Sequence, residues 1–303
     1  MDGTGTPDLL WGDSGNYRYI DFTGGIRPRL LRVVDNGLGK ITTIEYEPST
    51  KDYVRDMESG RTPTSVSPLP SMVVKRVTVS DSLGWQKVTE YYYHDGYYDG
   101  CEAEFRGYQE AEVREIGDVN SPTSWTRTRF HVGERQYGTQ CLDDNPYEGL
   151  KGQPVWTETF DENGIYLKTD WSSYKIEKLY TGLDDRDIYQ TYGNISGSFL
   201  YDTSNFIPAS AGNCLIKPSV DIEGTVVNQC VPLRSNTYAE LRSEILIDKL
   251  GNTITSSDFG IFNRTGDEVT NETRYGMIGS WLNRGVESWV EGHPERFDAG
   301  ERL

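Results

Sequence analysis

Hydrophobic and polar residues alternate with a period of two along much of this chain. In residues 41–47, for example, β-branched and aromatic side chains recur in near-alternation with polar ones. This spacing is typical of half-buried β-strands, whose successive side chains point to opposite faces of a sheet. It predicts strands over residues 41–47, 73–79, 86–93, 125–132, 155–160, 165–171, 242–247 and 253–259.

Short clusters of turn-forming residues separate several of these strands. Residues 160–164 and 247–252 share one pattern, in which an aromatic or apolar residue precedes an aspartate and a glycine follows three positions later; residues 81–84 form another turn cluster. An aspartate side chain caps such a turn, and the glycine adopts the positive φ that closes it. Repeated strand–turn–strand units of this kind predict an all-β fold built on a long antiparallel meandering sheet.

Signals for helices are few. Residues 50–57 fit one or two helical turns, with Ser49 or Thr50 as the N-terminal cap, Pro48 before and Gly60 after. The three prolines in residues 62–70 require an extended or looped backbone there. We therefore expect at most one short helix, near residues 50–58.

Charge and composition exclude two classes of function. The 303 residues include 30 Lys and Arg against 47 Asp and Glu, a net charge of −17, whereas a nucleic-acid-binding protein needs a basic face. No run of about 18 apolar residues exists, so we expect no membrane insertion. The first residues lack the basic and apolar regions of a signal peptide, and their glycine-rich character suggests that this segment is a fragment of a longer protein.

Catalytic motifs do not emerge from the sequence. His94, His131 and His293 are far apart in the chain, and we expect structural roles for them. Glu102 and Glu104, near Arg106, are the best candidates for the paired carboxylates of a glycosidase. The favoured interpretation of residues 102–106 is a strand with one charged face, in which Arg106 pairs with a carboxylate and locks the fold. We therefore predict that the chain is not an enzyme.

Cysteines and tyrosines each leave two interpretations open. Cys214 and Cys230 flank a segment with hairpin character, so they form either a disulfide or, in the favoured interpretation, free and partly buried thiols, as for Cys101 and Cys141. The tyrosines of residues 91–98 form either a packed corner or a platform for sugar rings, and packing is favoured. Asp95-Gly96 and Asp99-Gly100 predict two successive chain reversals.

Several blocks of the sequence resemble known toxin-delivery proteins. Residues 247–253 (IDKLGNT) and 266–275 (GDEVTNETRY) resemble the opening of a YD-repeat array in Rhs proteins. The middle of the chain is similar to the middle region of the B component of insecticidal toxin complexes (Tc toxins), over about residues 28–300. The blocks that carry this second resemblance are 34–39 (VDNGLG), 44–50 (IEYEPST), 92–100 (YYHDGYYDG), 104–108 (EFRGY), 128–133 (TRFHVG) and 150–153 (LKGQ).

The resemblance implies a structural role in a secreted bacterial toxin complex. In the family, the strands of this region begin a hollow β-sheet shell of the Rhs/YD-repeat type, which encloses a C-terminal toxin. The implied partners are an A-component-like pore protein and a C-component or Rhs toxin chain. An alternative is an extracellular carbohydrate-binding or adhesin module of an Rhs-type surface protein, and a glycan-active enzyme is a third, less favoured hypothesis.

The N-terminal residues resemble the last FG-GAP-like blade loop of the β-propeller that precedes the shell in this family. The resemblance implies a Ca²⁺ loop in which Asp2, Thr4 and Asp8 occupy ligand positions, because Ca²⁺ prefers oxygen ligands. Thr4 stands where an acidic ligand is common, so the loop departs from the family pattern, and we expect no other cofactor. The resulting division is a blade remnant and linker over residues 1–27, a Tc B-component-like segment over 28–165, and a β continuation into the shell over 166–303.

Overall fold

The computed structural model describes residues 3–6, 8–13, 15–63, 70–136, 140–262, 264–278 and 281–292. The chain divides into two compact units, Met1–Val132 and Gly133–Leu303. The domain boundaries expected after residues 27 and 165 stay predictions. No helix within the described ranges has both the length and the apolar character needed to cross a bilayer.

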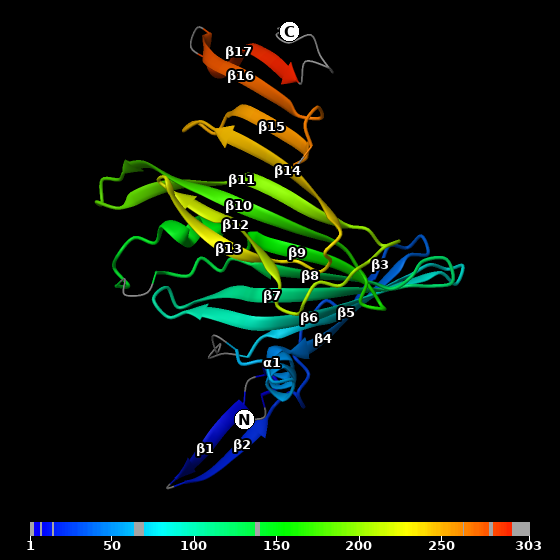
Figure 1. The fold of residues 1–303 in the computed structure, drawn as a ribbon. Helices are drawn as coiled ribbons and strands as arrows, with labels where there is room; N and C mark the ends of the chain where they lie inside the picture. The colour runs from blue at the N-terminus through cyan, green and yellow to red at the C-terminus, as the bar shows by residue number, and fades with distance from the viewer. Residues whose placement is uncertain are drawn as a thin grey trace. The chain divides into compact units, whose positions relative to one another are not determined.

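The first unit consists mainly of antiparallel strands that follow one another in chain order. A separate hairpin, β1 (Asp8–Asp13) with β2 (Asn16–Asp21), comes first. A larger sheet then runs in the order β3-β4-β5-β6-β7-β8 (Figure 1). Its strands are β3 (Val33–Asp35), β4 (Ile41–Pro48), β5 (Met72–Ser80), β6 (Gln86–Asp99), β7 (Glu104–Ile116) and β8 (Ser124–Phe130).

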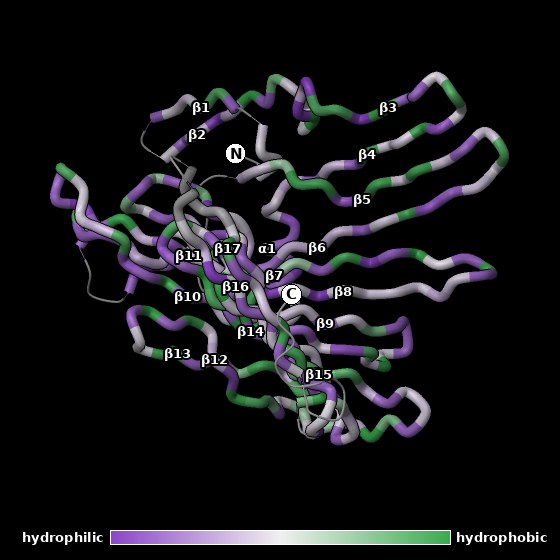
Figure 2. The backbone as a smooth tube through the Cα atoms, turned by 90° about the horizontal axis from the view of Figure 1, so that it is seen from above, coloured by the Kyte–Doolittle hydropathy of each residue, from purple (hydrophilic) through white to green (hydrophobic). Residues whose placement is uncertain are grey.

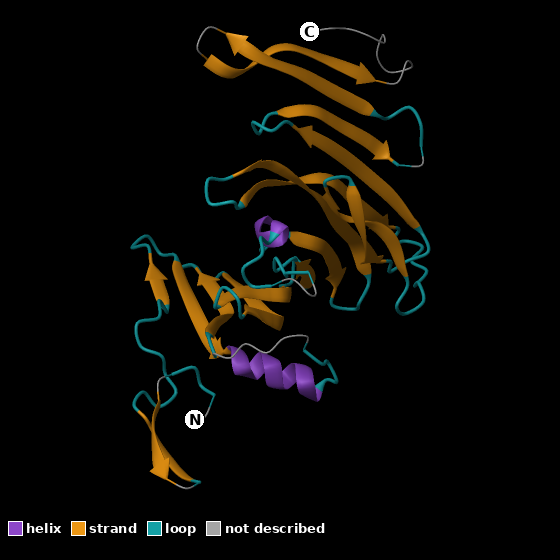
Figure 3. Ribbon diagram, turned by 90° about the vertical axis from the view of Figure 1, so that its left-hand side faces the viewer, coloured by secondary structure: helices purple, strands orange, loops and turns teal. Residues whose placement is uncertain are grey.

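Helix α1 (Ser49–Glu58) lies between β4 and β5 in the chain, as the sequence predicts (Figure 3). The predicted cap is wrong, because the N-cap residue is Pro48 and no side chain caps the helix. The hydroxyls of Ser49 and Thr50 have other partners. The Ser49 hydroxyl oxygen accepts a 3.0 Å bond from the Ser71 amide, and the Thr50 hydroxyl donates a 2.5 Å bond to the carbonyl of Gly3.

The second unit contains the longest strands, after a short 3₁₀ helix, η1 (Pro146–Leu150). Its main sheet has the order β9-β10-β11-β14-β15-β16-β17, with antiparallel pairs throughout. The strands are β9 (Pro154–Asp161), β10 (Tyr166–Thr181), β11 (Asp187–Tyr201), β14 (Tyr238–Ile247), β15 (Thr253–Ile261), β16 (Val269–Ile278) and β17 (Trp281–Gly292). The all-β, antiparallel meandering fold is thus confirmed, and all eight segments predicted as strands overlap observed ones.

A hairpin of β12 (Cys214–Ile222) and β13 (Thr225–Pro232) interrupts this order. β12 pairs in parallel with the second half of β10, around Tyr174↔Val220, beyond the part of β10 that pairs with β9. A disulfide joins Cys214 to Cys230 across the hairpin, with their Cα atoms 5.4 Å apart. The expectation of free thiols is therefore wrong, and none of the four cysteines, all within the described ranges, is free.

The hairpin turns show why the aspartate-containing pattern recurs. Asp161 Oδ1 accepts from the amides of Asn163 (2.9 Å) and Ile165 (2.8 Å), and Gly164 has φ +77°. Asp248 and Gly251 repeat this arrangement with the same spacing. Asp81 also does so, in the turn between β5 and β6. The side chain satisfies two amides that the turn leaves without backbone partners, so one local motif closes hairpins in both units.

Alternation along a strand sends successive side chains to opposite faces of the sheet, so that apolar side chains gather on one of them. Figure 2 shows hydrophobic and hydrophilic stretches following one another along strands such as β5. In the second unit the apolar side chains build a core between the main sheet and the β12–β13 hairpin. Its buried members are Val155, Trp156, Trp171, Phe199, Tyr201, Val231 and Leu233. A second cluster, formed by Leu150, Tyr174, Ile176 and Val220, lies where β12 joins β10.

One predicted chain reversal does not occur. Strand β6 continues through Asp95 and Gly96 without a change of register against β7, although Asp95 adopts φ +51°; the register shifts later, between Tyr97 and Tyr98. The chain reverses only after Asp99, whose Oδ1 accepts from the Cys101 amide at 2.8 Å. The prediction of two turns is wrong because the pairing of β6 with β7 continues across the Asp-Gly pair at 95–96.

Candidate functional site: a buried charged cluster around His94

Strands β6 and β7 bring acidic and imidazole side chains together on one face of the first unit. His94 lies directly opposite Glu110, and Glu112 is two residues further along β7, opposite Tyr92. Residues opposite each other and two positions apart share a face of an antiparallel sheet, which explains the grouping. Arg127 of β8 lies opposite Glu112 and extends the row of charges.

Helix α1 contributes two more carboxylates to the cluster. Asp52 and Asp56 are 2% and 4% exposed, whereas Tyr53, Val54 and Met57 of the same helix are exposed. The helix therefore buries its acidic residues and not its apolar ones. Arg55 Nη1 donates to Asp52 at 2.5 Å, and Arg55 Nη2 donates to the carbonyl of Tyr93 at 3.0 Å, so the helix is tied to β6 through polar contacts.

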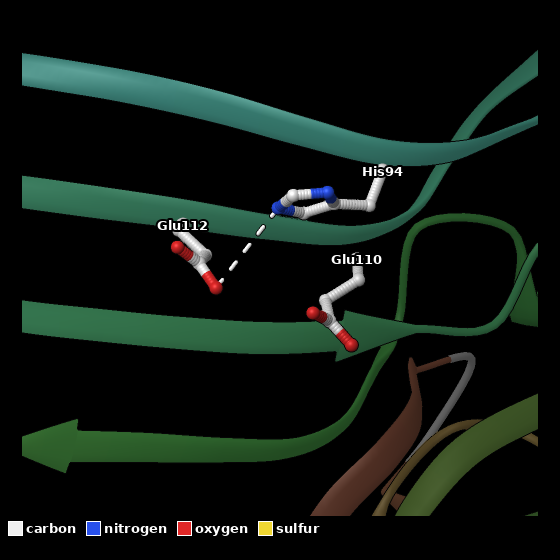
Figure 4. Close-up of side chains that lie close together, drawn as sticks. All are labelled: His94, Glu110 and Glu112. Atoms are coloured by element: carbon white, nitrogen blue, oxygen red, sulfur yellow. Dashed lines mark ion pairs between the residues drawn. The ribbon is translucent and has the colours of Figure 1, made fainter. Parts of the chain in front are cut away.

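The imidazole of His94 connects helix and sheet. Its Nδ1 lies 2.8 and 2.9 Å from the two carboxylate oxygens of Asp56. An ionised carboxylate only accepts, so these two short contacts assign the proton to Nδ1; Arg55 Nη2, which can only donate, lies further from this nitrogen, at 3.4 Å. On the other side of the ring, Nε2 points toward Glu112 and lies 3.9 Å from its Oε1, beyond hydrogen-bond distance (Figure 4).

Two arginines neutralise part of the negative charge. Arg61 Nη2 donates to Glu110 Oε1 at 2.6 Å, and Arg127 Nε donates to Glu112 Oε1 at 2.7 Å. Burial raises the pKa of Asp52, against the opposing effect of the Arg55 guanidinium. The cluster thus combines desolvated carboxylates with three guanidiniums and one imidazole, and it can either hold helix and sheet together or bind a cation.

The sequence singled out His94 but not the acidic residues around it. Asp56, Glu110 and Glu112 become neighbours of His94 only through the β6–β7 register and the packing of α1. The available signal was the Glu-Ala-Glu spacing of residues 110–112, which on a β-strand places two carboxylates on one face. Nothing local indicated which strand would lie opposite.

The carboxylates proposed for glycosidase chemistry lie elsewhere. Glu102 is in the turn before β7, Glu104 begins that strand, and both are exposed. The Arg106 side chain is fully buried, with Nη2 2.8 Å from Asp99 Oδ2 and Nε 3.6 Å from Glu104. Arg106 therefore pairs with the buried carboxylate of Asp99, as expected for a locking role.

The remaining candidate residues are dispersed. Asp2 and His293 lie outside the described residues, Thr4 shares a 2.8 Å hydrogen bond with the hydroxyl of Thr6, and Asp8 begins β1. The Ca²⁺ loop stays a prediction. His131 follows β8, where burial, assisted by the nearby Arg129, lowers its pKa to about 4.

Tyrosines of β6 contact other aromatic side chains. Tyr92 stacks on Trp125 with ring centroids 5.7 Å apart, and Tyr93 lies 4.8 Å from Tyr108. Burial raises the pKa of Tyr93 to about 12. These contacts fit a packed corner, because the rings face neighbouring side chains within the unit.

Comparison with protein families identifies the first unit. The model for the insecticide toxin TcdB middle/N-terminal region matches residues 1–133, which end next to the boundary of that unit at Val132. The resemblance to the Tc toxin B component is confirmed. A search of the curated proteins finds no match.

Solved structures of Tc toxins have the same fold as this chain. The Photorhabdus luminescens Tc holotoxin pore carrying the TccC3-D651A mutation matches with a TM-score of 0.65 and 14% identity, over 91% of this chain and 15% of that chain. The TcdB2-TccC3 crystal structure matches with a TM-score of 0.64 and 15% identity, over 96% and 17%. The chain thus spans about a sixth of the length of these Tc toxin chains, and at this identity the likeness establishes the fold.

Proposed function

We propose that this chain is a structural segment of a Tc-type toxin-delivery protein, and that it forms part of a β-sheet shell enclosing a C-terminal toxin. The observation that carries this proposal is the match of residues 1–133 to the TcdB middle region, together with a meandering sheet of the Tc toxin type. In this role the chain performs no catalysis of its own.

The lengths of the strands support the proposed role as part of a shell. β10 has 16 residues, β11 has 15 and β6 has 14, compared with a usual length of about 5–6. At about 3.3 Å per residue, β10 reaches roughly 50 Å. Long strands joined in chain order extend a sheet sideways by one strand at a time, which suits a surface that surrounds a volume.

The implied partners are an A-component-like pore protein and a C-component or Rhs-type toxin chain. The matched solved structures are those of a TcdB2-TccC3 complex and of a holotoxin pore. Secretion is part of the same proposal, and the Cys214–Cys230 disulfide supports it, since disulfides persist mainly in oxidising compartments.

A chimera tests enclosure. Residues 1–303 would replace the matching segment of TcdB2, and the chimera would be co-expressed with TccC3 and treated with protease. We expect the C-terminal toxin polypeptide to be protected as in native TcdB2-TccC3, with a TcdB2 lacking the segment as the unprotected control. Cleavage as fast as in that control, although the two chains co-elute, would contradict the proposal.

Binding of the isolated chain to a glycan array would instead favour the carbohydrate-binding alternative.

A further inference from the structure

We propose that His94, Glu110 and Glu112 bind a divalent transition-metal ion of the Zn²⁺ type, with Asp56 orienting the imidazole. One ligand atom from each of the three residues lies within 4.8 Å of the others. One imidazole nitrogen and two carboxylate oxygens form a mixed nitrogen and oxygen set, which Zn²⁺ accepts at about 2.0–2.2 Å. The site lies entirely within the first unit, on β6 and β7 (Figure 4).

The imidazole provides the evidence that points to an ion. His94 is only 7% exposed, and its Nε2 has no hydrogen-bond partner among the described residues. A buried polar atom without a partner is costly. The atom is directed toward Glu112, at a distance too long for a direct bond. An ion between the nitrogen and the two carboxylates would satisfy all three.

Asp56 gives the imidazole the tautomer that a metal requires. Since Nδ1 donates to Asp56, Nε2 is the nitrogen whose lone pair is available in the neutral ring. Metal-binding histidines commonly donate their other N–H to a carboxylate in this way, which fixes the ring and increases its basicity. Asp56 is 4% exposed, so solvent does not compete for the contact.

The distances require small side-chain movements. Tetrahedral ligands at about 2.1 Å from Zn²⁺ are about 3.4 Å apart. The separation between Nε2 and Glu112 Oε1 is 3.9 Å, and the three ligand atoms lie within 4.8 Å of one another, so contractions of up to about 1.4 Å bring the set to tetrahedral spacing. Rotation about the terminal torsions of the two glutamates can provide them, because those torsions are broad.

The arginines leave room for the ion. Arg61 and Arg127 each donate to Oε1 of their glutamate, and since an ionised carboxylate offers about four lone-pair sites, each group can bind an ion besides its arginine. Four carboxylates, those of Asp52, Asp56, Glu110 and Glu112, face the three guanidiniums of Arg55, Arg61 and Arg127, which leaves one negative charge when His94 is neutral. A bound cation would compensate this charge and link α1 to the sheet through Asp56 and His94.

Zinc titration of the full chain, followed by calorimetry and by thermal unfolding, tests the proposal. We expect one Zn²⁺ per chain, with a dissociation constant of about 1 µM or below, and a rise in melting temperature. His94→Gln and Glu112→Gln should each weaken binding at least about 100-fold, and Asp56→Asn about 10–100-fold. Co²⁺ binding to the wild-type chain provides a second measurement, because Co²⁺ in a site of low symmetry with few ligands absorbs visible light.

Glu90→Gln is the matched control. Glu90 also lies on β6 and is paired with arginines, Arg76 and Arg114, but it is not a ligand of the proposed site. Its substitution should leave zinc affinity within about twofold of the wild type. Equal zinc affinity in wild type, His94→Gln and Glu112→Gln, or no zinc binding by the folded wild-type chain, would overturn the proposal and leave the cluster as an ion-pair network. Neither result bears on the shell function.

Discussion

Trp171 and Gly197 lie opposite each other in the β10–β11 pair, and the glycine makes room for the indole. Trp171 is 1% exposed and belongs to the core of the second unit. A Cβ atom on Gly197 would lie 2.5 Å from the indole Nε1 and 2.6 Å from Cε2. Real Cβ contacts are longer than this, so the indole occupies space that only glycine leaves open.

Gly197→Ala should therefore destabilise the second unit. The added methyl forces the indole or the strand to move, and overpacking of a tight core costs about 1–3 kcal/mol. Gly193→Ala on the same strand is the control, because its Cβ would lie 3.7 Å from the Tyr174 ring, an ordinary contact. Urea unfolding should show a lower midpoint for Gly197→Ala and little change for Gly193→Ala. Equal midpoints would mean that the core relaxes around Trp171 without cost.

The local parts of this fold were predictable from the sequence. Alternation and the Asp-x-x-Gly pattern act within a few residues, which is why β4, β5, β9 and the turns at Asp161 and Asp248 were found. The parallel pairing of β12 with β10 was not predictable, because it depends on where β9 ends along β10. The closeness of Gly197 to Trp171 has the same cause, since strand register sets it.

The site around His94 shows this limit more sharply. Its residues come from α1, β6 and β7, and each segment alone has an ordinary composition for a surface helix or a polar strand. Only the buried position of Asp56 and the unsatisfied Nε2 of His94 distinguish the cluster from an exposed row of charges. Both properties arise from tertiary packing, for which a single sequence carries no direct signal.

Glu158 and Arg234 form a buried ion pair, in which removal of one partner alone should be strongly destabilising. Glu158 of β9 is fully buried, and Arg234, 76 residues later, binds it through both Nε and Nη2, the latter at 3.0 Å. Arg234→Ala removes the guanidinium that binds this buried carboxylate through two nitrogens, which should cost about 3–5 kcal/mol in free energy of unfolding.

The double variant Glu158→Met with Arg234→Leu separates the two effects in that pair. It removes both charges, so its stability should return most of the way to that of the wild type, since an apolar pair often replaces a buried ion pair at little cost. Chemical denaturation of the three proteins gives the comparison. A double variant as unstable as Arg234→Ala would show that packing by the arginine, which also lies over the Tyr166 ring at 4.9 Å, dominates.

The Cys214–Cys230 disulfide should stabilise the hairpin that covers the core. It closes a segment with a sequence separation of 16, for which loss of chain entropy in the unfolded state predicts about 3 kcal/mol. The Cys214→Ser, Cys230→Ser variant should unfold at a lower denaturant concentration than the wild type under oxidising conditions. Because Val231 beside the bond is fully buried, the variant should also expose apolar surface and bind a hydrophobic dye at milder denaturation. Unchanged unfolding would place the hairpin outside the cooperative unit.

His131 predicts a loss of stability in mild acid. Burial lowers its pKa to about 4, from 6.5 in the unfolded chain. The folded state therefore favours the neutral ring, so its contribution is fully present above pH 6.5 and is lost as the pH falls through about 4. Over this pH window, the pKa shift corresponds to a loss of about 3 kcal/mol in the free energy of unfolding.

Carboxylates also titrate in this pH range. The Arg76 hydrogen bond lowers the pKa of Glu90, and the stabilisation from this group is lost as the pH falls below its unfolded value of 4.5. The His131→Gln variant isolates the histidine: its free energy of unfolding should fall less than that of the wild type between pH 7 and pH 4.5. Parallel pH profiles would show that His131 titrates normally in the folded protein.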